Sequence, residues 1–144
     1  MAGEPLRLKM QKGLYGPYAD NLNKVLETLE GHFILGYDGS RKPDKALRLV
    51  PSAPAAAEEF LSQEIEAKTR LDRVGELIEG FETPYGMELL SSVHFVAKHD
   101  DPIASTFDEV VQAIRSWNDR KRDLMNQDHI RIAWDHLRTL GWLQ

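Results

Sequence analysis

The chain has 144 residues and a formal net charge of −5, with 18 Lys and Arg against 23 Asp and Glu, and it contains no cysteine. This length suffices for one domain with its own core, and the absence of cysteine excludes disulfides, thiolate metal sites and cysteine nucleophiles. The acidic balance argues against duplex DNA binding, because neutralisation of phosphates by Lys and Arg provides much of that affinity, and it favours a basic partner.

The first residues, MAGEPLRLKM, lack the apolar run of a signal peptide, and no segment has the length and composition of a membrane span. We therefore expect a soluble cytoplasmic protein. Residues 1–13 mix Gly, Pro, Lys and Arg without periodicity, which is typical of an N-terminal tail or linker stub. No internal repeat or low-complexity tract divides residues 14–144, so we expect a single domain there.

The first two predicted elements are a helix and a hairpin. Apolar residues at three- and four-residue spacing predict an amphipathic helix that begins near Tyr18 and ends at Gly31, with Pro17 in its opening turn. A short apolar run, a loop rich in Gly, Asp and Pro, and a second run follow. They predict a β-hairpin with strands near residues 32–37 and 45–50.

The rest of the chain is predicted to be helical. One segment is apolar on nearly all sides, as in the central helix of a bundle, and another follows a capping box made by Thr106 and Glu109. The predicted helices lie near residues 51–60, 65–79, 85–97, 106–117 and 126–140. Together these elements predict a mostly α (α+β) fold, a compact helical domain of about six helices with one small β-hairpin.

No set of side chains in the sequence is typical of an enzyme. His129 and His136 share a helix face but lie two turns apart, too far for one metal ion without a ligand between them. Adjacent acidic residues point apart on a helix, and no HExxH, GxSxG, P-loop or GxGxxG motif is present. We therefore expect no catalytic residues, no cofactor and no metal site, and so no enzyme activity.

An alternative interpretation is a winged-helix-like DNA-binding domain, for example an autorepressor. Residues 119–123, DRKRD, form the densest basic segment and precede a last helix, HIRIAWDHLRTLGWL, whose pattern is typical of the end of such domains. The flanking aspartates make this a face of mixed sign, which is usually only solvated. In this interpretation the DNA contacts would be Arg120, Lys121, Arg122 and Arg131.

Three tyrosines stand beside proline-containing turns: Tyr15 and Tyr18 in YGPYADNL, and Tyr85 in GFETPYGMELL. A tyrosine can bury its ring and leave its hydroxyl in water, which fits packing at the margin of a core. Tyrosine is also enriched among the residues that dominate protein interfaces. The residues alone leave both roles open.

The stretches YGPYADNL, GFETPYGMELL and HIRIAWDHLRTLGWL, in this order and separation, resemble the C-terminal domain of DarG, the antitoxin family of DarT/DarG toxin–antitoxin systems. The resemblance covers about residues 13–143. It implies a partner toxin, DarT, that uses NAD to attach ADP-ribose to single-stranded DNA, and an N-terminal macrodomain that removes it from thymidine. The chain does not match the ADP-ribose pocket of that macrodomain, so the resemblance implies direct binding of the toxin and no glycohydrolase activity.

The resemblance and the acidic composition together suggest inhibition by DNA mimicry. Grooves that hold a single strand carry cations and stacking platforms, so carboxylates can replace phosphates and tyrosines can replace bases. The expected partners are a DarT-like DNA ADP-ribosyltransferase and, in the full-length protein, the macrodomain, while direct DNA binding is not expected. The candidate toxin-binding residues are Tyr15, Tyr18, Asp20, Asn21, Glu76, Glu79, Glu82, Tyr85 and Glu88.

Overall fold

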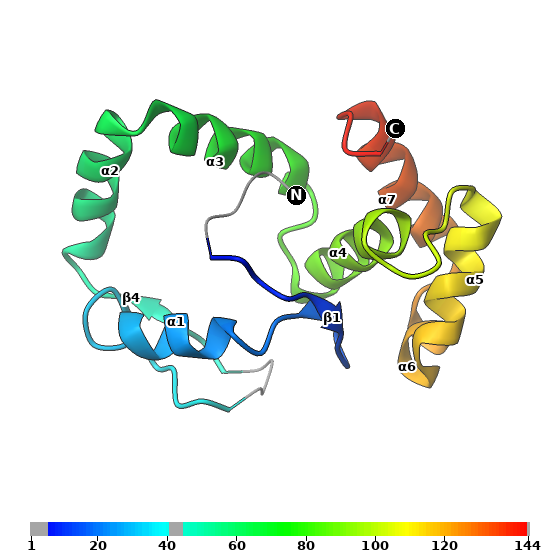
Figure 1. Cartoon of the computed structure of the whole chain (residues 1–144), viewed down its shortest axis with the longest axis horizontal. Coiled ribbons are helices and arrows are strands. Elements are labelled where there is room, and N and C mark those ends of the chain that lie inside the picture. The colour runs from blue at the N-terminus through cyan, green and yellow to red at the C-terminus, as the bar shows by residue number, and fades with distance from the viewer. Residues whose placement is uncertain (1–5, 41–44, 144) are drawn as a thin grey trace. The chain divides into compact units, whose positions relative to one another are not determined.

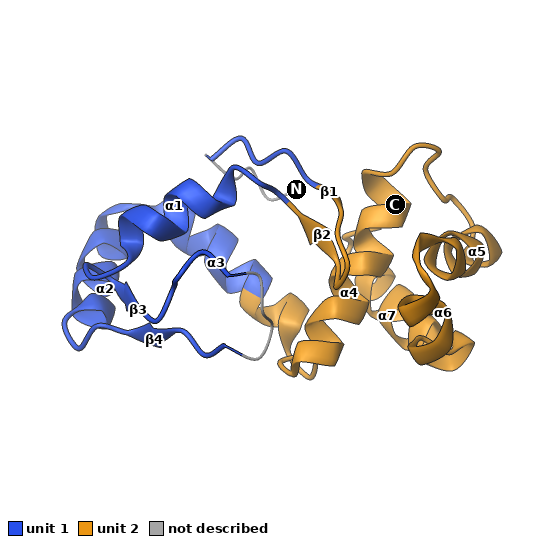
Figure 2. Cartoon of the chain, turned by 90° about the horizontal axis from the view of Figure 1, so that it is seen from below, with its two compact units in different colours: residues 1–10, 19–74 blue, residues 11–18, 75–144 orange. Residues whose placement is uncertain are grey.

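The computed structural model describes residues 6–40 and 45–143. These residues form seven helices and two small antiparallel sheets of two strands each, which confirms the predicted mostly α class (Figure 1). The chain divides into two compact units, coloured separately in Figure 2. Unit 1 comprises residues 1–10 and 19–74, and unit 2 comprises residues 11–18 and 75–144.

Unit 1 contains two complete helices, one hairpin and most of a third helix. Its elements are α1 (Leu22–Leu29), β3 (Ile34–Leu35), β4 (Arg48–Leu49), α2 (Ala53–Gln63) and the larger part of α3 (Ile65–Ile78). Ile34 lies opposite Leu49 in an antiparallel pair, which confirms the hairpin predicted from the two apolar runs. Only Ala19 and Ala53 are buried among the described residues of unit 1, so this unit has little apolar core.

Unit 2 begins with a hairpin that was not predicted. Strand β1 (Gln11–Lys12) pairs antiparallel with β2 (Pro17–Tyr18), and α1 begins only at Leu22. The expectation that Pro17 opens a helix is therefore wrong. Its missing N–H is equally acceptable in a short strand that pairs on one side. The turn is closed by a hydrogen bond of 2.8 Å from the Gly13 N–H to the Gly16 carbonyl.

The helices of unit 2 begin where the sequence predicts caps. Its elements after β2 are the end of α3, α4 (Pro84–Lys98), α5 (Phe107–Trp117), α6 (Asp119–Leu124) and α7 (Gln127–Thr139). The Thr83 hydroxyl accepts the Gly86 N–H at the start of α4, and Thr106 and Glu109 form the predicted capping box of α5. Helix α6 was not predicted, because residues 119–124 are mostly charged.

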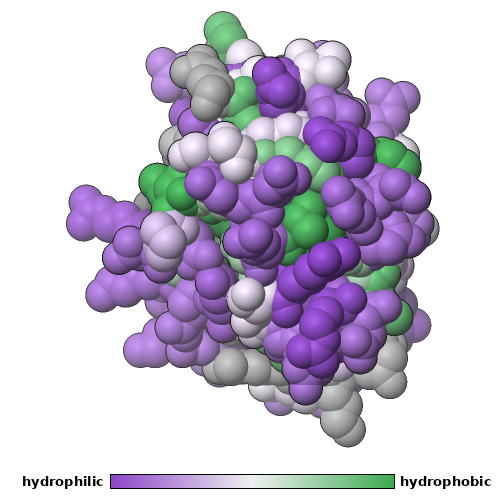
Figure 3. Space-filling view, turned by 90° about the vertical axis from the view of Figure 1, so that its right-hand side faces the viewer, coloured by the Kyte–Doolittle hydropathy of each residue, from purple (hydrophilic) through white to green (hydrophobic). Residues whose placement is uncertain are grey.

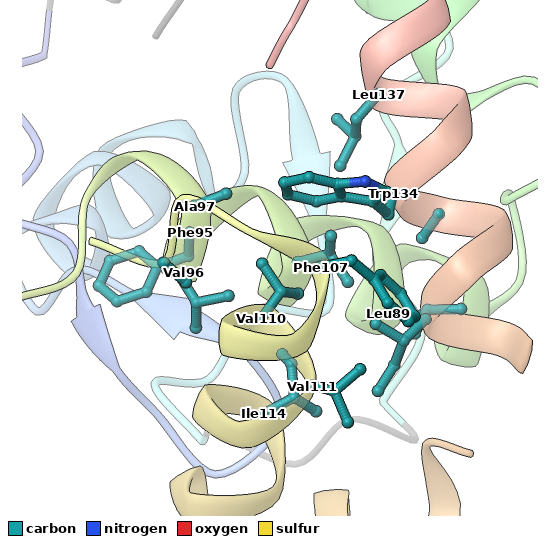
Figure 4. Close-up of a cluster of buried hydrophobic side chains, with 14 of the residues drawn as sticks. Leu89, Phe95, Val96, Ala97, Phe107, Val110, Val111, Ile114, Trp134 and Leu137 are labelled. Carbon is teal, nitrogen blue, oxygen red and sulfur yellow. The ribbon is translucent and has the colours of Figure 1, made fainter. Parts of the chain in front are cut away.

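The core of unit 2 lies where α4, α5 and α7 pack together (Figure 4). Nine of the 15 residues of α4 are buried, which confirms that it is the central helix. Val110 and Ile114 of α5 and Leu137 of α7 are fully buried, and the rings of Phe107 and Trp134 lie 6.4 Å apart (Figure 4). Each large apolar side chain buried here contributes about 1.5–3 kcal/mol, so this cluster is the main source of stability in unit 2.

The surface on the side shown in Figure 3 is mostly hydrophilic, with smaller hydrophobic areas between the polar side chains. In unit 2 the exposed large aliphatic residues and methionines are Leu14, Met87, Ile103, Leu124 and Ile132. Within residues 6–40 and 45–143, no helix combines the length and the apolar composition needed to cross a lipid bilayer.

Candidate protein-interaction site

The turn of the first hairpin, residues 13–16, is hydrogen-bonded through its backbone to side chains at the junction of α5 and α6. Three successive backbone carbonyls of this hairpin turn accept one hydrogen bond each. Trp117 Nε1 donates to Gly13 at 2.8 Å, Asn118 Nδ2 donates to Leu14 at 3.1 Å, and Lys121 Nζ donates to Tyr15 at 3.2 Å. We call these three side chains the carbonyl clamp. It fixes the backbone of the YGPY motif to the helical part of unit 2.

Lys121 is the centre of a buried polar cluster. Asn118 caps α6 by accepting the Lys121 N–H at 2.8 Å, and the first turn of the helix directs the lysine inward. The ammonium is fully buried and donates to Glu88 Oε1 and to Ser92 Oγ, each at 2.9 Å. With the Tyr15 carbonyl as third acceptor, every N–H of the ammonium has a partner. Burial lowers the pKa of Lys121, and the neighbouring Glu88 carboxylate acts in the opposite direction.

The four cations that the DNA-binding alternative requires all make contacts within the protein, and Arg122 and Arg131 also remain exposed at its surface. Arg120 pairs with Glu88, Arg122 lies 3.0 Å from Asp119, and the Arg131 guanidinium lies 3.3 Å from the centroid of the Phe107 ring. Contrary to the expectation for that alternative, Lys121 cannot contact a DNA backbone, because none of its surface is exposed. The basic segment therefore has a structural role in unit 2.

The candidate carboxylates of unit 2 fall into an exposed and a buried group. Glu76, Glu79 and Glu82 are exposed, at the end of α3 and just after it. Glu88 is only 8% exposed, and both of its basic partners come from α6. Glu88 is therefore not available as a surface substitute for a phosphate, because reaching a partner would break a buried ion pair.

The three candidate tyrosines occupy different environments. Tyr15 is exposed at the hairpin turn, with the Arg120 guanidinium 4.8 Å from its ring centroid. Tyr18 is half-buried in β2. Tyr85 is half-buried, and its hydroxyl lies 2.8 Å from Nδ1 of His129, which connects α4 to α7. Burial raises the pKa of Tyr85, so its hydroxyl stays protonated at neutral pH. Of the three, Tyr15 has the position best suited to contact a partner.

Asp20 and Asn21 lie in unit 1, immediately before α1, and both are exposed. The Asn21 side chain accepts the Lys9 N–H at 3.3 Å and donates to the Arg7 carbonyl at 3.2 Å. It therefore ties the N-terminal segment to the start of α1. The other seven candidates belong to unit 2.

Sequence reasoning missed three residues at the hairpin turn. Leu14 is 59% exposed, and Trp117 and Asn118 each lie 104 positions from the carbonyl that they bind. No local pattern could connect side chains so distant in sequence. The available signal was Leu14 itself, a large aliphatic residue next to the Gly-Pro turn.

A separate hollow of about 310 Å³ lies at the start of α5, and none of the nine candidate residues lines it. It is lined by Ser105, Thr106, Phe107, Arg131, Trp134, Arg138 and Leu143.

Among the described residues, no three His, Asp or Glu side chains are grouped so that they could hold a metal ion. Burial, and to a lesser degree the nearby His99, lowers the pKa of His94 to about 4.

No protein-family model matches the chain. Over 143 residues, 99% of its length, the chain is 37% identical to a protein of Thermus aquaticus named DNA ADP-ribosyl glycohydrolase. It is 32% identical, over 142 residues and 94% of its length, to proteins of that name from Mycobacterium bovis and Mycobacterium tuberculosis. The chain is thus similar along nearly its whole length to a part of these relatives. The chain spans about two fifths of the length of these relatives, 39–40%.

Proposed function

We propose that this chain is an antitoxin domain that binds and inhibits a DarT-like DNA ADP-ribosyltransferase and catalyses no reaction itself. The observation that carries the proposal is the similarity, along nearly the whole chain, to proteins named DNA ADP-ribosyl glycohydrolase. An enzyme that removes ADP-ribosyl groups from DNA has a use only where another enzyme attaches them. That transferase is the natural partner for a further domain of the same protein.

The proposed mode of inhibition is occupation of the groove in which the toxin holds single-stranded DNA. Such grooves are cationic and carry aromatic stacking platforms. Unit 2 has 12 Asp and Glu against 8 Lys and Arg, a formal charge of −4, which complements a cationic groove. Glu76 lies in the last turn of α3, and the exposed Glu79 and Glu82 follow directly after the helix, so the three carboxylates are close together along the chain. These carboxylates take the place of phosphates, and the exposed Tyr15 ring takes the place of a base.

The alternative function, a DNA-binding autorepressor, has weaker support. Duplex binding requires a set of accessible cations on one face. Lys121 is buried, and the neighbouring Arg120 and Arg122 are both in ion pairs. Unit 2 is acidic, and the cations of its basic segment are paired within the protein. Its charge therefore fits binding to a cationic protein groove better than binding to DNA.

Charge removal at the proposed surface tests this function. We expect a variant with Glu76, Glu79 and Glu82 all changed to Gln to bind the toxin at least about tenfold more weakly at 50 mM salt, with a smaller difference at 500 mM, because salt screens exposed charges. Biolayer interferometry with the purified toxin measures both affinities. A control variant with Glu58, Glu59 and Glu66 changed to Gln removes the same charge from exposed positions of unit 1. Equal weakening by the two variants, or none by either, would contradict the proposed surface.

A further inference from the structure

We propose that Leu14 and Tyr15, at the tip of the hairpin turn, are the anchor that this chain inserts into the toxin's strand-holding groove, and that the carbonyl clamp positions this anchor before binding. The inference rests on the proposed function and deepens it, since it names the contact residues and the device that orients them. The clamp residues are positioning residues, because they act on the backbone of the tip.

The exposure of the tip indicates a contact role. Leu14 is 59% exposed and Tyr15 is 38% exposed, although both backbone carbonyls face inward to the clamp. A turn exposed only to water needs neither a large aliphatic nor an aromatic side chain. Tyrosine and arginine are enriched among interface residues that dominate affinity, and Arg120 lies directly over the Tyr15 ring. The tip therefore has the composition of a binding anchor.

Both the backbone and the ring of Tyr15 are fixed through one carboxylate. Oε1 of Glu88 accepts hydrogen bonds from Lys121 and from Arg120. Lys121 holds the Tyr15 carbonyl, and Arg120 lies against the Tyr15 ring. The sequence analysis predicted that Glu88 contacts the toxin. The buried Glu88 instead acts indirectly, by holding the two basic residues that position Tyr15.

The glycines of the turn add to this fixation. A Cβ on Gly13 would approach the Gly16 carbonyl oxygen to 2.7 Å, and a Cβ on Gly16 would lie 3.3 Å from Ser91 Oγ of α4. The turn therefore packs closely on itself and against the central helix. A loop that is ordered before it binds avoids the entropy loss of being ordered by its partner. This arrangement favours an anchor that enters a groove as a rigid unit.

The chemistry of the tip fits one occupant, an aromatic stacking platform in a groove built for single-stranded nucleic acid. A planar ring carried on a rigid turn can stack as a base does, and stacking platforms accept any planar π-face. The net charge of −4 on the same unit complements the cations that line such a groove. The Leu14 side chain fills apolar space beside the stacked ring.

A double-mutant cycle between the anchor and the clamp tests the inference. Tyr15→Ala removes the anchor ring, and Trp117→Phe removes the indole N–H that binds the Gly13 carbonyl while keeping an aromatic ring beside Phe95. We expect about tenfold weaker toxin binding for Tyr15→Ala and about fivefold for Trp117→Phe, with no further loss when the second change is added to the first. Leu14→Ala should also weaken binding at least about threefold.

Two controls separate positioning from general damage. Ile132→Ala shortens another exposed aliphatic residue of unit 2 and should change affinity less than about twofold. In the free Trp117→Phe protein, hydrogen exchange should become faster at the Gly13 amide, which bonds within the turn, and stay unchanged in α4. Faster exchange throughout unit 2 would contradict a positioning role for the clamp.

The outcomes also separate this inference from the proposed function. If the unmodified chain does not bind the toxin, the proposed function fails. If it binds and removal of the exposed carboxylates weakens it, but Leu14→Ala and Tyr15→Ala bind like the unmodified chain, the anchor is refuted and the proposed function stands. Additive effects of Tyr15→Ala and Trp117→Phe would refute the clamp alone.

Discussion

The carboxylate of Glu88 connects α4 to α6 and, through α6, to the hairpin turn. It is bonded by Lys121 and Arg120, and Lys121 also reaches Ser92 and the Tyr15 carbonyl. Removing one member of a buried ion pair is more harmful than removing both, because the remaining charge keeps its desolvation cost without a partner. Unit 2 should therefore be sensitive to single substitutions in this cluster.

Lys121→Met tests this sensitivity, since it keeps an unbranched side chain that is one atom shorter and removes the ammonium. We expect the free energy of unfolding to fall by about 3 kcal/mol, as measured by urea denaturation followed by circular dichroism. The double variant Glu88→Gln/Lys121→Met should recover a clear part of this loss, because it also removes the buried charge of Glu88, which in Lys121→Met keeps only the partly exposed Arg120 as a partner. Lys98→Met, at an exposed position of α4, should change stability by less than about 0.5 kcal/mol. A double variant no more stable than Lys121→Met would argue against a buried charge pair.

Among the helices, the sequence predicted those that begin with a capping residue directly before an apolar segment. Thr83, Thr106 and Asn126 each accept a backbone N–H at the start of a helix, as their positions before apolar segments indicate. Helix α6 lacks an apolar stripe and is fixed by burial of a lysine, which no periodicity reveals. Strands β1 and β2 have two residues each and, unlike β3 and β4, do not lie in apolar runs, which is why the β1–β2 hairpin was not predicted.

The capping box of α5 gives a quantitative test at this scale. Thr106→Ala removes the hydroxyl that accepts the Glu109 N–H, so the free energy of unfolding should fall by about 1 kcal/mol. Thr139→Ala, at the exposed last residue of α7, serves as the control and should have little effect. Thermal unfolding by calorimetry measures both. Similar losses for the two threonines would show that the cap does not stabilise α5 beyond helix propensity.

For the molecule as a whole, the sequence predicted the class of fold but only part of the candidate site. The exposure of Glu76 follows from the charged face of a surface helix, and Glu79 and Glu82 are exposed in the polar segment after it, as the sequence indicates directly. The burial of Glu88 does not follow from any local pattern, because its basic partners lie 32 and 33 positions further along the chain. The division into two units also depends on packing between distant segments, which no local pattern predicts. One unit has an extended core, and only two alanines are buried among the described residues of the other.

We propose that the chain takes the place of single-stranded DNA on its toxin. Fluorescence polarisation of a labelled oligonucleotide bound to the toxin, without NAD so that no transfer occurs, tests this directly. Added chain should displace the oligonucleotide, and the apparent Kd of the toxin for DNA should rise linearly with the concentration of chain. If the chain binds the toxin while the oligonucleotide stays bound with unchanged affinity, the chain does not occupy the DNA groove and the account is wrong.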